Sequence, residues 1–365
     1  MKKFAKIICA LALFLTSTIL VACGAEENQQ RLDEHQIFTG EEFTEEEVDQ
    51  HYGMAINPFT GLWVEESLAN RRPIAVVINN LPVALPQSGI SQADIIYEVL
   101  AEGGITRLIA IFTNTTADKV GPIRSTREYF AQLVANHNAV LVHHGGSQTG
   151  YNAISTLGLQ NLDGMVLEGS YFWRDQERVH SPGMREHSSY TNQENIHSYM
   201  ESRGFSLENN TDYLFNFYEE FTLPQGRLVN EIVLPFSNFQ MSTFIFDEQS
   251  RLFYRYQRGA PHMDEYTDTQ IAVANIIVQQ VPKNVIAGDP EGRMNVNLIG
   301  SGTGYFATNG IFTPITWQKT SANSPTVFLD QNGRPLTLNP GQTWIGVLQT
   351  SVMPIFNLSI NEYID

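Results

Sequence analysis

Arginines and carboxylates gather in one stretch of this chain, and such side chains hold anions in many proteins. Arg124 and Arg127 flank a Ser-Thr pair, and Arg107 opens the apolar run upstream of them. Guanidinium groups bind phosphate or carboxylate through two parallel hydrogen bonds. Asp94 and Glu98 lie four residues apart, so in a helix they would share one face. The pattern predicts either an anion site or internal ion pairs between these arginines and nearby acidic side chains.

A helix is expected to begin at this Ser-Thr pair. Ser125 and Thr126 are good N-cap residues, and Glu128 can act as the capping-box partner. The N-terminus of a helix favours anions, and the two flanking arginines would strengthen that preference.

A second polar group follows the apolar run at residues 139–142, where His-His-Gly-Gly-Ser leads into a predicted helix. A strand, a glycine-rich turn and a helix form the place where α/β proteins bind ligands. His143 and His144 are adjacent and point to opposite sides, so they cannot bind one metal together. We therefore expect one histidine to be buried, and we assign His144 and Ser147 to the anion site. The motif lacks the last glycine of G-x-S-x-G.

Residues 163–187 have no clear periodicity and mix aromatic side chains with arginines and histidines. This stretch is either a wall or lid over a ligand, or a surface loop held by aromatic anchors. No H-E-x-x-H, S-x-x-K or C-x-x-C motif occurs in the chain. The sequence therefore identifies no catalytic residue, metal site or cofactor, and whether the protein is an enzyme stays open.

The N-terminus has the pattern of a bacterial lipoprotein signal. Lysines precede an apolar run that ends in Leu-Val-Ala-Cys, so we expect cleavage after residues 1–22 and a diacylglyceryl group on Cys23. The alternatives are an ordinary secretory signal or a retained anchor. Cys9 would leave with the signal, which excludes a disulfide in the mature chain. The expected location is the extracytoplasmic face of the cell membrane.

Net charge limits the partners of the protein. The formal charge is −17, and loss of a signal with three lysines and no acidic residue makes it about −20. Such a charge argues against nucleic acid and against electrostatic docking on anionic lipid. Residues 23–56 are acidic and lack apolar periodicity, so we predict a disordered tether that spans about 30 Å on average.

Two folded domains are expected after the tether. Buried strands at 73–78, 107–112 and 139–142, with a helix at 192–203, predict an α/β or α+β domain over residues 57–205. That domain would have a mixed sheet with flanking helices.

The second domain, over residues 225–352, should be β-rich because short β-type runs alternate with turns. Asn332-Gly333 indicates a hairpin. Residues 300–304 are expected to form a glycine-rich turn, and 261–264 a turn beside a strand.

Several long motifs carry a resemblance to a known family. They are NPFTGL at 57–62, RPIAVVINN at 72–80, PQSGISQADIIYE at 86–98, EGGITR at 102–107, VGPIRSTREYF at 120–130, HGGS at 144–147, YQRGAPHMD at 256–264, WQK at 317–319 and PGQTWI at 340–345. With the lipobox, they resemble the YerB-like family of bacterial lipoproteins, whose function is unknown. The resemblance implies surface location and a two-domain build, and it supplies no catalytic residue. His187 departs from the family pattern, since Glu186 and Ser188 replace the flanking Pro and Asn.

Two functional hypotheses follow. The first is an envelope lipoprotein that binds an anionic ligand or a protein partner. The alternative is an envelope enzyme acting on a polyprenyl-phosphate-linked or cell-wall polymer, because the motif order is similar to that of the LytR-CpsA-Psr phosphotransferases. In that alternative the three arginines would hold pyrophosphate, and Asp94 would bind Mg²⁺ or activate an acceptor. The alternative requires the arginines and a carboxylate to meet in one open pocket.

Overall fold

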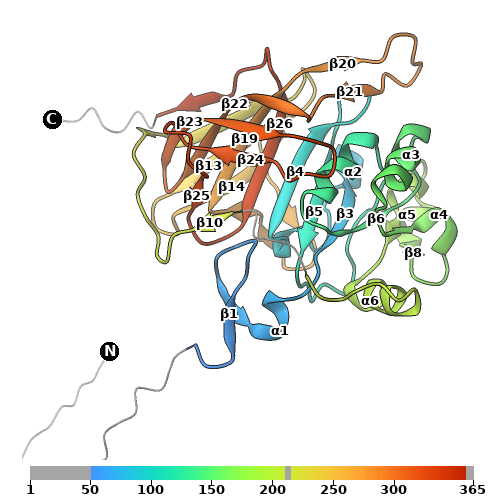
Figure 1. Ribbon diagram of the computed structural model, residues 1–365. Coiled ribbons are helices and arrows are strands. Elements are labelled where there is room, and N and C mark those ends of the chain that lie inside the picture. The colour runs from blue at the N-terminus through green and yellow to red at the C-terminus, as the bar shows by residue number, and fades with distance from the viewer. Residues whose placement is uncertain (1–50, 210–214, 359–365) are drawn as a thin grey trace, which may run out of the picture. The chain divides into compact units, whose positions relative to one another are not determined.

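One mixed sheet of eleven strands runs through both halves of the chain (Figure 1). The computed structural model describes residues 51–209 and 215–358, so the predicted signal, Cys23 and most of the tether lie outside the described residues. The strands are, in spatial order, β11 (Arg227–Leu228), β23 (Ile311–Lys319), β22 (Gly300–Thr308), β19 (Asn275–Val281), β26 (Thr343–Gln349), β4 (Ile95–Leu100), β5 (Thr106–Phe112), β3 (Ile74–Asn79), β6 (Val140–His143) and β7 (Asn161–Asp163), with β24 (Val327–Leu329) paired to β23.

The two halves of the chain meet inside this sheet. Strand β26 lies parallel to β19 on one side and parallel to β4 on the other, with Trp344 opposite both Ile276 and Ile96. The mixed N-terminal sheet and the strand-rich C-terminal half, both expected from the sequence, are thus joined by continuous backbone hydrogen bonds.

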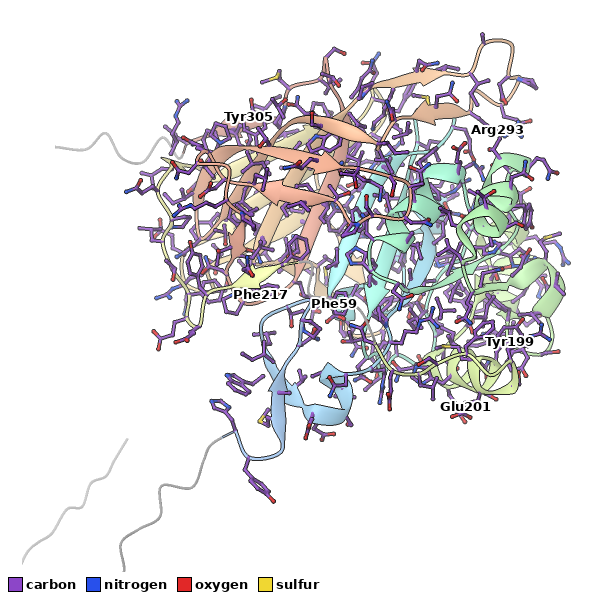
Figure 2. All side chains as sticks on the ribbon, viewed as in Figure 1. Phe59, Tyr199, Glu201, Phe217, Arg293 and Tyr305 are labelled. Carbon is purple, nitrogen blue, oxygen red and sulfur yellow. The ribbon has the colours of Figure 1, made fainter. Side chains whose placement is uncertain are left out.

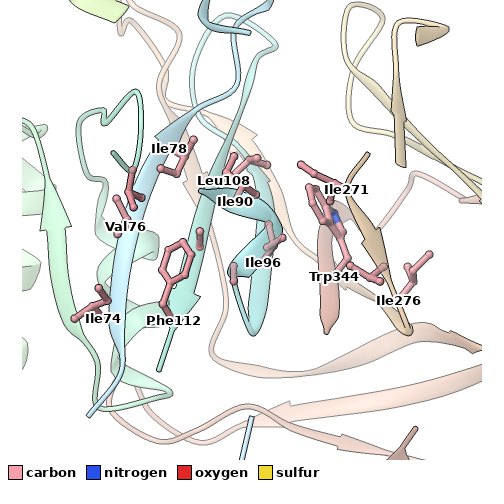
Figure 3. Close-up of a cluster of buried hydrophobic side chains, with 14 of the residues drawn as sticks. Ile74, Val76, Ile78, Ile90, Ile96, Leu108, Phe112, Ile271, Ile276 and Trp344 are labelled. Carbon is pink, nitrogen blue, oxygen red and sulfur yellow. The ribbon is translucent and has the colours of Figure 1, made fainter. Parts of the chain in front are cut away.

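The central strands are apolar on both faces because both faces are covered. Ile74, Val76 and Ile78 of β3 belong to one buried cluster, while Ala75 and Val77 belong to a second cluster on the opposite face. The first cluster continues across the sheet to the C-terminal strands (Figure 3). A strand that is buried on both faces has a continuous apolar sequence, which is why these strands could be predicted.

Helices cover the N-terminal half of the sheet. The helices are α1 (Glu66–Ala69), α2 (Glu128–Ala135), α3 (Gln148–Leu157), α4 (Gly164–Leu167), α5 (Gln176–His180) and α6 (Gln193–Ser202), with the 3-10 turns η1 (Pro82–Ala84), η2 (Ile90–Gln92) and η3 (Arg185–His187). Helix α2 packs on one face, and Ile196 and Met200 of α6 pack on the other. The predicted helix at 192–203 is confirmed as α6, where the Asn192 side chain accepts a hydrogen bond from the Asn195 N–H.

A second, antiparallel sheet packs against the C-terminal half of the central sheet, on the face that carries the first buried cluster. Its strands are β15 (Ala260–Pro261), β14 (Leu252–Gln257), β13 (Met241–Asp247), β12 (Glu231–Pro235) and β27 (Ile355–Asn357), with β18 (Ala272–Val273) on β14. The rings of Phe244 and Trp344 meet edge to face between the two sheets, 5.4 Å apart.

Five two-stranded ribbons complete the described fold. They are β1 (Met54–Ile56) with β2 (Trp63–Glu65), β8 (Trp173–Arg174) with β9 (Ser189–Tyr190), β10 (Asn216–Phe217) with β25 (Thr337–Leu338), β16 (Met263–Asp264) with β17 (Thr269–Gln270), and β20 (Lys283–Val285) with β21 (Met294–Val296).

The structure differs from several local expectations. The condition under which Asp94 and Glu98 would share a helix face is not met, since Asp94 lies in a bend and Glu98 in strand β4, because Ile, Tyr and Val at 95–99 favour a buried strand. Helix α2 begins after Arg127 without a side-chain cap. The glycines at 300–304 lie in β22, where a Cβ on Gly304 would approach the Val278 carbonyl oxygen to 2.1 Å.

Two other segments differ in part from the expectation. Residues 54–56, assigned to the tether, form β1. The turn at Asn332-Gly333 joins residues that form a Leu329–Pro335 bridge, but β25 beyond it pairs with β10.

Candidate functional site

A hollow of about 520 Å³ lies where β6 ends, and we call it the arginine hollow. Its lining consists of Ile123, Arg124, Ser125, His144, Gly145, Gly146, Tyr151, Met165, Arg174, Arg185, Glu186 and Ser189. Two backbone segments form its floor, since the His144 N–H donates to the Arg124 carbonyl and the Thr126 N–H donates to the Gly145 carbonyl. The positive φ of 74° at Gly145 allows the chain to turn here.

Three guanidinium groups meet in this hollow. The Arg124 Nη2 lies 3.3 Å from a carboxylate oxygen of Glu186, and its buried Nε has no hydrogen-bond partner among the described residues. Arg174 donates to Glu168, and its Nη1 also donates to the backbone carbonyl of Arg185 at 2.7 Å. The Arg185 side chain itself makes no hydrogen bond within the part of the chain that the structure describes. Two of the three arginines therefore keep hydrogen-bonding capacity for a ligand.

His144 is neutral and has a defined tautomer. Its Nε2 lies 3.1 Å from Arg174 Nη2, which can only donate, so Nε2 must accept. The proton is therefore on Nδ1, which donates to the Ser189 hydroxyl at 2.9 Å. Burial, and then the charge of Arg174, lower the pKa of His144. Because Nδ1 already carries a proton, His144 cannot act as the base that activates Ser189. In a catalytic triad the histidine accepts the serine hydroxyl proton, whereas here the histidine donates to the hydroxyl.

Asp163 fixes the shape of one side of the hollow. Its Oδ1 accepts hydrogen bonds from the backbone N–H groups of Gly145 at 2.8 Å and Met165 at 2.9 Å. Its Oδ2 accepts the hydroxyl of Tyr151 at 2.7 Å. Burial alone would raise the pKa of Asp163, but the hydrogen bonds from Tyr151 and Gly145 outweigh it and lower the pKa. The Asp163 carboxylate thus holds the backbone of Gly145 and Met165 and the side chain of Tyr151 in place.

Two of the predicted arginines lie outside the arginine hollow. Arg107 and Arg127 both pair with Glu102, and Arg127 contacts it through Nη2 at 2.7 Å and Nε at 3.1 Å. Burial, and then the charge of Arg127, lower the pKa of Arg107 to about 10. These two arginines form the internal ion pairs that were the alternative to an anion site.

The two predicted carboxylates are also buried elsewhere. Asp94 accepts hydrogen bonds from the Thr113 N–H at 2.6 Å and from the Asn57 amide at 3.2 Å. Burial raises the pKa of Asp94 to about 6. Glu98 is fully buried and faces Arg255 of the C-terminal half. Of the seven predicted site residues, the arginine hollow contains Arg124 and His144.

The adjacent histidines and Ser147 have distinct positions. His143 is fully buried, whereas His144 faces the arginine hollow. Ser147 caps helix α3, accepting the Gly150 N–H at 3.1 Å. His187 is buried, and its Nδ1 lies 2.6 Å from the Asn79 amide, which places it in the packing beside the hollow.

Arg174 and Arg185 were not assigned to the site from the sequence, although both lie in the 163–187 stretch, for which a wall or lid was one of two interpretations. The signal available was the three arginines interspersed with aromatic side chains in that stretch. No cluster of three His, Cys, Asp or Glu side chains suited to a metal ion occurs among residues 51–209 and 215–358. None of the helices described in those ranges is long and apolar enough to cross a membrane.

Comparisons with known proteins agree with the resemblance seen in the sequence. Residues 59–206 match the N-terminal domain, and residues 232–345 the C-terminal domain, of a family described as "Protein of unknown function (DUF3048)". A Bacillus subtilis protein named "Putative lipoprotein YerB" is 33% identical over 293 residues, covering 80% of this chain and 85% of the relative. The crystal structure of the Bacillus subtilis YerB protein superposes with a TM-score of 0.73 at 31% identity, covering 82% of this chain and 99% of that chain.

Proposed function

This chain belongs to the DUF3048 family of two-domain proteins of unknown function, and we propose that it is a membrane-anchored envelope lipoprotein that binds an anion in the arginine hollow. The lipobox at Cys23 and the name of the Bacillus subtilis relative support the anchor. The anchor places the hollow on the extracytoplasmic side, where the ligand is an envelope component.

The contrast between local and overall charge carries the proposal. The chain has 39 acidic residues against 22 Lys and Arg, yet three arginines and one carboxylate line the arginine hollow. Arg185 has no side-chain hydrogen bond among the described residues, and the Arg124 Nε is buried without a partner there. Arg124 and Arg174 are paired with Glu186 and Glu168, but guanidinium groups that keep unused donors at a concave site are suited to phosphate or carboxylate, which accept bidentate hydrogen bonds.

Binding fits the geometry better than catalysis of polymer transfer. The enzyme hypothesis needs Asp94 beside the arginines, but the Asp94 carboxylate is buried against Thr113 and Asn57. His144 is protonated on the nitrogen that faces Ser189, so it does not supply a base. The hollow therefore offers positive charge and hydrogen-bond donors, and His144 is not available there to activate a serine hydroxyl.

Isothermal titration calorimetry on the mature chain, residues 23–365 with Cys23→Ser, would test the anion site. The probes are inorganic phosphate, pyrophosphate and citrate. We expect Arg185→Gln to weaken binding about tenfold or more, since a hydrogen bond to a charged group contributes about 1.5–3 kcal/mol. Arg124→Gln should weaken binding by a similar factor.

Arg258→Gln is the matched control, because Arg258 is exposed and lies outside the arginine hollow. Its affinities should equal those of the parent chain. No heat of binding with any of the three anions, or equal binding by the parent and Arg185→Gln chains, would refute the anion site.

A further inference from the structure

Helix α4 exposes two consecutive apolar side chains at the rim of the arginine hollow. Met165 is 66% exposed and lines the hollow, and the neighbouring Val166 is 79% exposed. Single exposed apolar residues are common on protein surfaces, but two large ones beside a charged hollow form a distinct apolar edge. The hollow thus combines guanidinium groups at its base with hydrocarbon at its mouth.

Helix α4 is held firmly in this place. The Asp163 carboxylate accepts the Met165 N–H at 2.9 Å and the Gly145 N–H at 2.8 Å, which ties the helix to the floor of the hollow. Gly164 permits the close approach, since a Cβ there would lie 2.4 Å from His144 Nδ1. The fixed backbone of α4 therefore keeps the side chains of Met165 and Val166 exposed to solvent.

A second, smaller hollow continues beyond α4. It has a volume of about 330 Å³, and its lining includes Val166 and Leu167 of α4 and Tyr199 of α6. Phe205 and Leu159 add further apolar surface, while Gln160, Asn161, Asp163 and Arg203 complete its lining. Figure 2 labels Tyr199 on α6, below and beside α4. Apolar surface thus extends from the arginine hollow across α4.

We propose that the anion bound in the arginine hollow is the head group of an alkyl phosphate, whose hydrocarbon chain lies along Met165 and Val166 of α4. The inference rests on the proposed anion site and names its ligand class. The phosphate would accept hydrogen bonds from Arg124 and Arg185, and the methionine side chain is flexible enough to follow an alkyl chain. A phosphate ester without a long alkyl chain would contact only the arginines.

Two probes of equal charge separate these ligands. Methyl phosphate and octyl phosphate, below its micelle concentration, are titrated into the full mature chain with Cys23→Ser. Each fully buried methylene contributes a factor of about four in affinity, so burial of two along α4 predicts octyl phosphate to bind about tenfold tighter or more. Met165→Gln and Val166→Thr should both reduce the ratio of octyl to methyl phosphate affinity. Val166→Thr, at a side chain outside the lining of the arginine hollow, should in addition leave the affinity for methyl phosphate unchanged. Val285→Thr, at a side chain 56% exposed on β20, is the matched control.

Each outcome is decisive. If methyl phosphate binds and the octyl chain adds nothing, the alkyl-phosphate inference is wrong and the anion site stands. If the octyl advantage survives in both α4 variants, the hydrocarbon lies elsewhere and the inference is also wrong. If neither ester binds while inorganic phosphate or pyrophosphate does, the alkyl-phosphate inference is wrong and the anion site stands; if none of these anions binds, the anion site itself is refuted. The inference is supported only when the octyl advantage is present in the parent chain and falls in both α4 variants.

Discussion

Glu98 of β4 and Arg255 of β14 form an ion pair in which neither side chain is exposed to solvent. The pair joins the N-terminal half of the central sheet to the second sheet, with a separation of 3.4 Å between Arg255 Nη2 and Glu98 Oε2. Glu98 also accepts the hydroxyl of Ser242 at 2.7 Å and that of Thr106 at 2.8 Å. The guanidinium carbon of Arg255 lies 4.5 Å from the ring centre of Trp344. Residues far apart in the sequence thus share one buried polar network.

Removing one partner of this pair should destabilise the fold strongly. Arg255→Met leaves the Glu98 carboxylate buried without its counter-charge, which costs about 3–5 kcal/mol in the free energy of unfolding. The double variant Glu98→Gln/Arg255→Met should lose less than the sum of the two single variants, because no unpaired charge remains. Urea denaturation of the four chains measures this coupling.

The exposed pair Asp330–Arg334 is the control, with side chains 26% and 73% exposed. Removing this pair by Arg334→Gln should change the free energy of unfolding far less than Arg255→Met does, because solvent screens an ion pair at the surface. Additive losses at Glu98 and Arg255 would contradict the buried-pair interpretation.

The strands and helices that could be predicted from the sequence are those that a short stretch of residues indicates by itself. Apolar runs identified β3, β5 and β6, and the helix predicted at residues 192–203 corresponds to α6. The insertion of β26 beside β4 had no local signal, since the two strands are separated by more than 240 residues of chain. Long-range pairing is set by the total packing of the core and not by either strand alone.

The candidate site was predictable only in part for a similar reason. Arg124 and Arg127 are three residues apart, but the helix begins after Arg127, so Arg124 lines the arginine hollow while Arg127 turns to Glu102. Arg174 lies in the two-residue strand β8 and Arg185 begins the 3-10 turn η3, and neither element is long enough for a sequence periodicity to indicate side-chain direction. The residue types were visible in the sequence, but their orientation was not.

Asp94 should make stability fall as the pH rises. Burial raises its pKa to about 6 from the usual 3.8, so the folded chain holds a proton that the unfolded chain releases. The stabilising contribution of this proton is complete below about pH 4 and is lost as the pH rises through about 6, a change of about 3 kcal/mol. Asp94→Asn removes this titration. The free energy of unfolding of the parent chain, relative to Asp94→Asn, should therefore decrease from pH 4 to pH 7 in urea titrations.

Asp268→Asn serves as the control for that experiment, because Asp268 lies exposed in the turn between β16 and β17. The pH profile of this variant supplies the baseline with which that of Asp94→Asn is compared. A constant difference for Asp94→Asn would mean that Asp94 is ionised in the folded protein throughout.

Arg174 should control the protonation of His144. Burial and the Arg174 charge lower the pKa of His144, and Arg174 occupies the Nε2 lone pair from 3.1 Å. Arg174→Gln removes the charge and frees Glu168, whose carboxylate lies 3.7 Å from Nε2, to stabilise the imidazolium. The pKa of His144, followed by NMR titration of its ring protons, should rise in this variant and remain unchanged in Arg258→Gln. The added positive charge would then make anion binding strengthen at lower pH, which calorimetry at two pH values can detect. An unchanged pKa would show that Arg174 does not control the protonation of His144.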